Sequence, residues 1–182
     1  DLFQVCEFLG TGFSMAVIGT MLVVASRWDG ARKDMSFAWG ATWLASSSSW
    51  VIWAKSGLEQ SLAALLPLVS ATLLWQLVED AERVDPNDQA VLTKRAMLSG
   101  VIMGLGCMTR PEIHLVAVIV GMPLLVDAIR KRKLAKHAVA WAGAVLLVTV
   151  PFHLFRYGYY HSWLPNTFYV KTGKGSMIWR AG

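Results

Sequence analysis

Six apolar runs, separated by short clusters of charged residues, constrain this chain more than any other feature. An α-helix rises 1.5 Å per residue, so about 20 apolar residues cross a hydrocarbon core of about 30 Å. The runs are residues 5–26, 35–54, 60–78, 96–109, 112–129 and 138–155. They predict an all-α, polytopic transmembrane bundle with about six membrane-embedded helices.

Composition supports a membrane protein over a soluble domain. Hydrophobic residues make up 55% of the 182 residues and charged residues only 16%, whereas soluble domains carry about 25% charged residues. No linker divides the chain. We therefore predict one transmembrane bundle over residues 1–155, followed by an extracytoplasmic loop over residues 156–182.

The distribution of Lys and Arg predicts an orientation. Eleven of the 17 basic residues lie in segments 27–34, 79–95 and 130–137, and six lie in the alternate segments. Because short basic loops stay in the cytoplasm, the first set is predicted to be cytoplasmic. Topology also explains the net charge of +5. We expect no nucleic-acid partner, since no stacking aromatics surround these basic residues.

The fourth and fifth runs are short and are separated only by Thr109–Glu112. Two helices too short to cross the membrane upright predict a connecting turn below the membrane surface. Arg110 in that turn is then expected to be largely buried against an acid, a carbonyl or a lipid phosphate.

Three polar stretches, residues 53–59, 108–114 and 155–173, are predicted on the same extracytoplasmic face. Glu59 and Glu112 are candidate orienting acids for a hydroxyl-rich substrate, and Arg110 is a candidate phosphate ligand. Each has a structural alternative. Glu59 suits the first turn of a helix, and Arg110 and Glu112 can pair with each other.

The third stretch adds the remaining candidate ligands. An interfacial aromatic belt is the structural alternative for it. Positive charges near the boundary suit the phosphate of a lipid-linked substrate, and aromatic and amide groups suit sugars. The candidates for phosphate are Arg156 and Lys171, and those for sugar or acceptor are Tyr159, Tyr160, His161 and Asn166.

Neither a metal nor a cofactor is expected. The acidic segment 79–88 lacks the spacing of a calcium-binding loop. Cys6 and Cys107 lie inside apolar runs, where they are interpreted as packing residues. His114, two residues into an apolar helix, is interpreted as a buried structural histidine.

Three motifs carry a family resemblance. Trp53-Ala-Lys-Ser-Gly-Leu-Glu59, Gly104-Leu-Gly-Cys-Met-Thr-Arg-Pro-Glu112 and Tyr157-Gly-Tyr-Tyr-His-Ser-Trp-Leu-Pro-Asn-Thr-Phe-Tyr-Val-Lys171 occur in this order. Together they resemble the GT-C class of polytopic glycosyltransferases over roughly residues 40–175. The branch with the most similar motifs includes the mycobacterial arabinofuranosyltransferases of the cell wall. The chain departs from that branch at Lys55, Gln60, Ile113 and His161.

The resemblance implies transfer of a sugar from a polyprenyl-phosphate donor to an extracytoplasmic acceptor hydroxyl. In that class the catalytic acid lies on a loop after the first membrane helix, and no residue here matches it. The catalytic residue therefore stays unassigned, and the chain is expected to be the middle of a longer enzyme. Its expected partners are the lipid-linked donor, membrane lipids and membrane-protein subunits.

Two other functions stay open at this stage. A non-catalytic membrane subunit derived from such an enzyme would pack into a larger complex through its Trp-rich helices. A transporter or flippase is disfavoured because no run carries paired midplane charges or the sign of a broken helix.

Overall fold

The computed structural model describes residues 1–32, 36–56, 58–81, 89–130 and 134–161, and these residues form only helices and their connections. The helices are α1 (Leu2–Arg32), α2 (Ser36–Ser46), α3 (Ser48–Ser56), α4 (Leu58–Asp80), α5 (Gln89–Thr109), α6 (Ile113–Arg130) and α7 (Ala135–Tyr160). No strand occurs among the described residues. The all-α prediction is confirmed.

Five of these helices are long and apolar enough to cross a membrane. The candidate spans are Gln4–Arg27, Glu59–Asp80, Gln89–Thr109, Ile113–Arg130 and Ala135–Tyr160. Much of their surface is apolar and outward-facing. On α6 the exposed side chains include Leu115, Val118, Met122 and Ile129, as expected for helices that contact lipid. The chain is therefore a multi-pass helical membrane protein.

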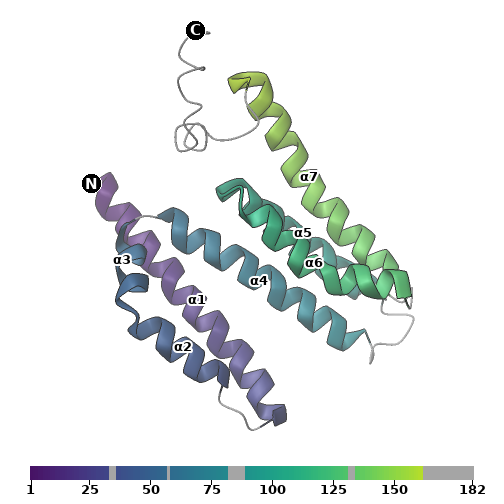
Figure 1. Cartoon of the computed structure of the whole chain (residues 1–182), viewed down its shortest axis with the longest axis horizontal. Coiled ribbons are helices and arrows are strands. Elements are labelled where there is room, and N and C mark those ends of the chain that lie inside the picture. The colour runs from purple at the N-terminus through teal and green to yellow at the C-terminus, as the bar shows by residue number, and fades with distance from the viewer. Residues whose placement is uncertain (33–35, 57, 82–88, 131–133, 162–182) are drawn as a thin grey trace.

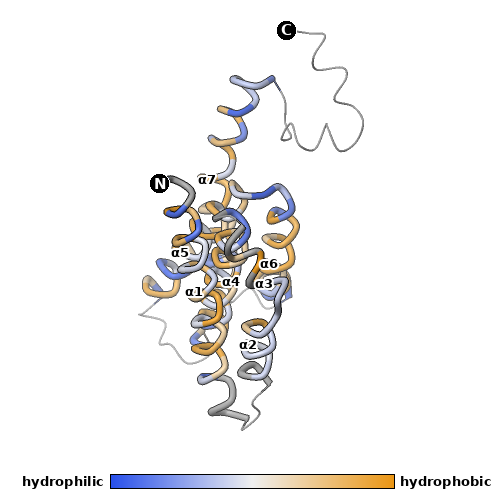
Figure 2. Tube along the Cα trace, turned by 90° about the vertical axis from the view of Figure 1, so that its left-hand side faces the viewer, coloured by the Kyte–Doolittle hydropathy of each residue, from blue (hydrophilic) through white to orange (hydrophobic). Residues whose placement is uncertain are grey.

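The long helices α4 to α7 run alternately up and down, which gives the bundle two ends (Figure 1). We call the end at which α4 and α6 finish and α5 and α7 begin the basic end. The opposite end, where α4 and α6 begin, is the head end. Hydrophobic segments fill the middle of the bundle, and hydrophilic ones gather toward its ends (Figure 2). Successive helices begin at alternate ends of the bundle, in the predicted order. Which of the two ends faces the cytoplasm stays a prediction.

The second predicted span, residues 35–54, is not one helix. It divides at Ser47 into α2 of 11 residues and α3 of 9 residues, each too short to cross a bilayer. At the break, Ser46 Oγ donates to the carbonyl of Trp43, and the amide of Ser47 donates to the carbonyl of Leu44. Serines compete with helical hydrogen bonding in this way. The absence of a broken helix was one of the two arguments against a transporter, and this break removes it.

The fourth span is longer than predicted, so the expected short pair of helices is wrong for α5. Its 21 residues begin at Gln89, seven residues before the apolar run. Lys94 and Arg95 lie inside the helix, where Arg95 forms an ion pair with Asp80 of α4. Long basic side chains are good helix formers and keep their charge at the membrane boundary. Helix length therefore gives no reason to bury the turn at Arg110.

The last span also extends beyond its predicted end. Helix α7 continues to Tyr160 and ends at His161, whose φ of 50° is left-handed and whose amide donates to the carbonyl of Tyr157. Residues 156–160, predicted to begin the loop, are thus helical. In Figure 1 this end of α7 projects past the other helices.

Buried serines connect the helices across the core. Ser70 of α4 and Ser99 of α5 donate to each other's carbonyl oxygens over 3.0 and 2.9 Å. Trp141 Nε1 of α7 donates to Ser99 Oγ over 3.2 Å. Ser14 of α1 and Ser61 of α4 are hydrogen-bonded over 2.7 Å. Such hydrogen bonds, together with close packing at small residues, hold membrane helices together. The hydrophobic effect contributes little, because an apolar side chain is as favourably placed against lipid as against another helix.

Helix α5 approaches α7 so closely that two glycines are required. A Cβ on Gly100 would lie 2.5 Å from the Trp141 carbonyl oxygen, and one on Gly104 would lie 2.8 Å from Val148 Cβ. A Cβ on Gly121 of α6 would lie 2.5 Å from the Trp141 ring. These three positions determine how closely α5, α6 and α7 pack.

Replacing Gly100 by Ala tests this contact. Gly100→Ala should lower the free energy of unfolding by about 1 to 3 kcal/mol, because the helices must separate to admit the methyl group. Gly143→Ala, on an open face of α7 with nothing within 4 Å, should change it by less than about 1 kcal/mol. Unfolding in mixed micelles by added SDS measures both. Equal effects would contradict the proposed packing.

Single cysteines test which way the bundle faces. Ala90, exposed at the start of α5, and Gly158, exposed near the end of α7, lie at opposite ends. In a background lacking Cys6 and Cys107, a membrane-impermeant maleimide should label Gly158→Cys on intact cells. It should label Ala90→Cys only after permeabilisation, because the excess of Lys and Arg predicts that the basic end faces the cytoplasm. Labelling of both variants on intact cells would refute this orientation.

Candidate functional site

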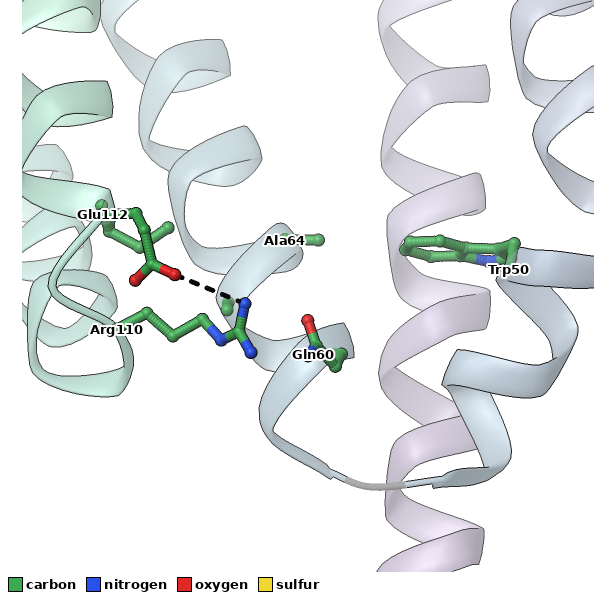
Figure 3. A pocket seen from close by; sticks show the side chains of 7 residues that line it. Trp50, Gln60, Ala64, Arg110 and Glu112 are labelled. Carbon is green, nitrogen blue, oxygen red and sulfur yellow. Dashed lines mark ion pairs between the residues drawn. The ribbon is translucent and has the colours of Figure 1, made fainter. Parts of the chain in front are cut away.

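A cavity of about 350 Å³ opens at the head end of the bundle. Helix α3, the first turns of α4 and the turn between α5 and α6 surround it. We call it the head pocket, and its lining residues are Trp50, Gln60, Ala63, Ala64, Arg110, Glu112 and Ile113. In Figure 3, Arg110 reaches into it from one side, and the Trp50 ring extends toward it from the other.

Arg110 links the polar groups around this pocket. Its Nε donates to Glu59 Oε1 over 2.9 Å, and its Nη1 lies 3.7 Å from Glu112 Oε1. Glu59 belongs to the first turn of α4, and Glu112 precedes α6, so one guanidinium joins two helix beginnings. Arg110 is about one-third exposed (33%). The prediction that an acid lies within its reach is confirmed, but the side chain is not largely buried.

The charges of this triad do not cancel. Two carboxylates face one guanidinium, which leaves the cluster with a net charge of −1 when all three are ionised. A free phosphate would meet an Arg110 whose charge is already compensated. Hydroxyl groups, in contrast, can donate to the remaining carboxylate oxygens. The arrangement therefore favours a hydroxylated ligand at the head pocket over a bare phosphate.

Two further residues contribute to the lining of the head pocket. The Nε1 of Trp50 is buried and has no hydrogen-bond partner among the described residues. The Gln60 amide supplies both donors and an acceptor. The Trp50 ring offers an apolar face, and the Gln60 amide and the Glu112 carboxylate offer polar groups beside it, which is a combination that suits sugars. Sequence analysis identified neither residue as a ligand.

The structure brings together Glu59, Arg110 and Glu112, although 51 residues separate Glu59 from Arg110. The other predicted ligands that the structure describes do not line the head pocket. Arg156, Tyr159 and Tyr160 lie in the last turns of α7, and His161 terminates that helix. Asn166 and Lys171 lie outside the described residues.

One of the α7 residues keeps an unused donor. The Nε of Arg156 is buried without a hydrogen-bond partner among the described residues. Tyr159 and Tyr160 are exposed, and Tyr159 packs against Phe155 and Tyr160. These tyrosines have the exposure of an aromatic belt at a membrane boundary.

A pair of histidines joins α6 to α7 near the head end. His114 Nε2 lies 3.0 Å from His153 Nε2, and His114 Nδ1 lies 3.0 Å from the Pro111 carbonyl oxygen. Since a carbonyl only accepts, His114 carries its proton on Nδ1, and His153 donates to its Nε2. His114 is thus a hydrogen-bonded histidine in this geometry, but it is half-buried and not buried as the sequence interpretation expected.

Comparisons with known proteins identify no relative. No protein-family model, curated protein or solved structure matches the chain. The function must therefore be argued from the site.

A double-mutant cycle tests the Glu59–Arg110 pair. Glu59→Gln and Arg110→Gln should show a coupling of about 0.2 to 1 kcal/mol in the free energy of unfolding, small because both side chains are partly exposed. Glu59→Gln with Arg130→Gln is the control, because Arg130 ends α6 at the basic end. Coupling no larger for Arg110 than for Arg130 would contradict the observed pairing.

Proposed function

We propose that the intact protein is a membrane glycosyltransferase. It would transfer a sugar from a polyprenyl-phosphate donor to an acceptor hydroxyl at the extracytoplasmic face of a bacterial inner membrane. The observation that carries this proposal is the pair of carboxylates, Glu59 and Glu112, held by Arg110 beside the head pocket. The motif resemblance to GT-C enzymes supports the same reaction class.

The head pocket would bind the sugar or the acceptor. Hydroxyl groups of the ligand would donate to Glu59 and Glu112, and one sugar face would lie against Trp50. A carboxylate positioned in this way orients a reacting hydroxyl and, where it reaches the proton, removes it. Arg110 is a positioning residue in this scheme, because its charge is used in holding the two acids.

The donor phosphate then requires other cations. Arg156 is the described residue best suited to this role, since its half-buried side chain lies in the last turns of α7 and its Nε has no hydrogen-bond partner among the described residues. A charge-assisted bond from Arg to phosphate stabilises the negative charge that develops on the leaving group. Lys171 remains a second candidate on the basis of sequence alone.

Neutral replacement of the acids tests the proposal. In the full-length protein in nanodiscs, Glu59→Gln and Glu112→Gln should each lower transfer from a radiolabelled polyprenyl-phosphate sugar by about 100-fold, because correctly placed acid–base groups contribute that much. Glu79→Gln, the same change at the basic end, should keep the wild-type rate. Folded yield should be equal for all three variants.

Near-normal transfer by both acid variants would overturn the site assignment. Absence of any transfer by the full-length wild type, across donors that label the membrane fraction, would favour the alternative of a non-catalytic subunit.

A further inference from the structure

Two histidines connect α7 to the turn that carries Arg110 and Glu112. His153 of α7 donates from Nε2 to His114 Nε2 of α6 over 3.0 Å, and His114 Nδ1 donates to the Pro111 carbonyl oxygen over 3.0 Å. We propose that His153 is a positioning residue: acting through His114, it holds Arg110 and Glu112 where the head pocket requires them. This inference rests on the proposed function.

The turn between α5 and α6 is held only loosely by its own backbone. The amides of residues 113, 114 and 115 each donate to the carbonyl oxygen three residues earlier, over 3.1 to 3.3 Å. Hydrogen bonds over three residues have poorer geometry than the four-residue bonds of an α-helix. The Pro111 carbonyl accepts from both the amide and the ring of His114. The imidazole therefore adds a link that the backbone of this turn does not supply.

Both histidines lie in candidate membrane spans, close to the head end. An ionisable side chain is costly in such a segment, and each of these rings is half-buried. Apolar packing, or a serine of the kind used in the core of this bundle, would join α6 to α7 at less cost. The N–H···N bond instead fixes the direction in which one ring meets the other. That favours a role in positioning over simple adhesion of the helices.

Helix α7 also carries the other group that the proposed reaction needs. Arg156, the described candidate for the donor phosphate, lies three residues after His153, so the two residues are neighbours on one face of α7. Glu112, at the other end of this chain of hydrogen bonds, lines the head pocket. The His114–His153 bond therefore sets the spacing between the acid and the phosphate ligand. A misplacement of about 1 Å at a reacting group costs about 100-fold in rate.

Removing one hydrogen-bond donor tests this role. His153→Met keeps an unbranched side chain without an N–H, whereas in His153→Gln the amide reaches the position of Nε2 and keeps the donor. In the full-length protein in nanodiscs, supplied with a radiolabelled polyprenyl-phosphate sugar, His153→Met should lower kcat per folded molecule about tenfold. His153→Gln should keep the wild-type rate, and so should Leu154→Met on the exposed face of α7. A purely structural bond would change the folded yield and leave kcat per folded molecule unchanged.

Hydrogen exchange follows the same link without any substrate. In His153→Met, the amides of residues 113–115 should exchange about fivefold faster than in wild type or in His153→Gln, because the turn opens more often. Amides near Arg130, at the other end of α6, should keep their rates. His114→Asn keeps a donor for the Pro111 carbonyl but does not reach α7. It should behave like His153→Met, and it replaces that variant if His153→Met folds poorly.

Wild-type kcat in both His153→Met and His114→Asn would overturn the proposal. So would an equal loss in His153→Met and His153→Gln, since the donor would then not be what matters. The proposed function fails separately. No transfer by the wild type would reject glycosyl transfer, while faster exchange in His153→Met would still support the link to the turn. Faster exchange with unchanged kcat would reject the positioning role and leave the proposed function in place.

Discussion

The contact among α4, α5 and α7 at Ser70, Ser99 and Trp141 is the interaction on which the rest of the bundle depends. Inside a membrane, a buried hydroxyl must find a protein partner, and here each hydroxyl donates to a carbonyl on the neighbouring helix. Gly100, next to Ser99, permits the backbone of α7 to come close enough for Trp141 to join them. These contacts set the level of the first turn of α4 relative to the turn between α5 and α6.

The head pocket is a consequence of that arrangement. Once α4 and α5 are aligned at their centres, the start of α4 and the end of α5 lie at the same level, and Arg110 can reach Glu59. The same alignment leaves α4 and α6 parallel, with a cavity of about 350 Å³ at the boundary and one of about 250 Å³ within the membrane. The core thus sets the depth of both cavities, and the exposed residues set their chemistry.

Most of the fold could be predicted from sequence, because hydrocarbon thickness imposes a helix length and leaves few alternatives. Three boundaries could not, and one of them is the end of α7 at Tyr160, five residues beyond the apolar run. The break at Ser47 depends on local serine hydrogen bonds, and the start of α5 at Gln89 depends on Arg95 finding Asp80 across the helix pair. The predicted topology places Glu59 and Arg110 on the same side of the membrane. It could not show that these two side chains, 51 residues apart, form an ion pair.

The central claim is that the head pocket, between Trp50 and Glu112, binds the sugar of a lipid-linked donor or its acceptor. A cryo-EM structure of the full-length protein in nanodiscs, with a non-hydrolysable polyprenyl-phosphonate sugar, tests it most directly. The account predicts sugar density in contact with Trp50 and the Glu59–Arg110–Glu112 cluster. Sugar density at another end or face of the bundle, with the head pocket empty, would contradict it.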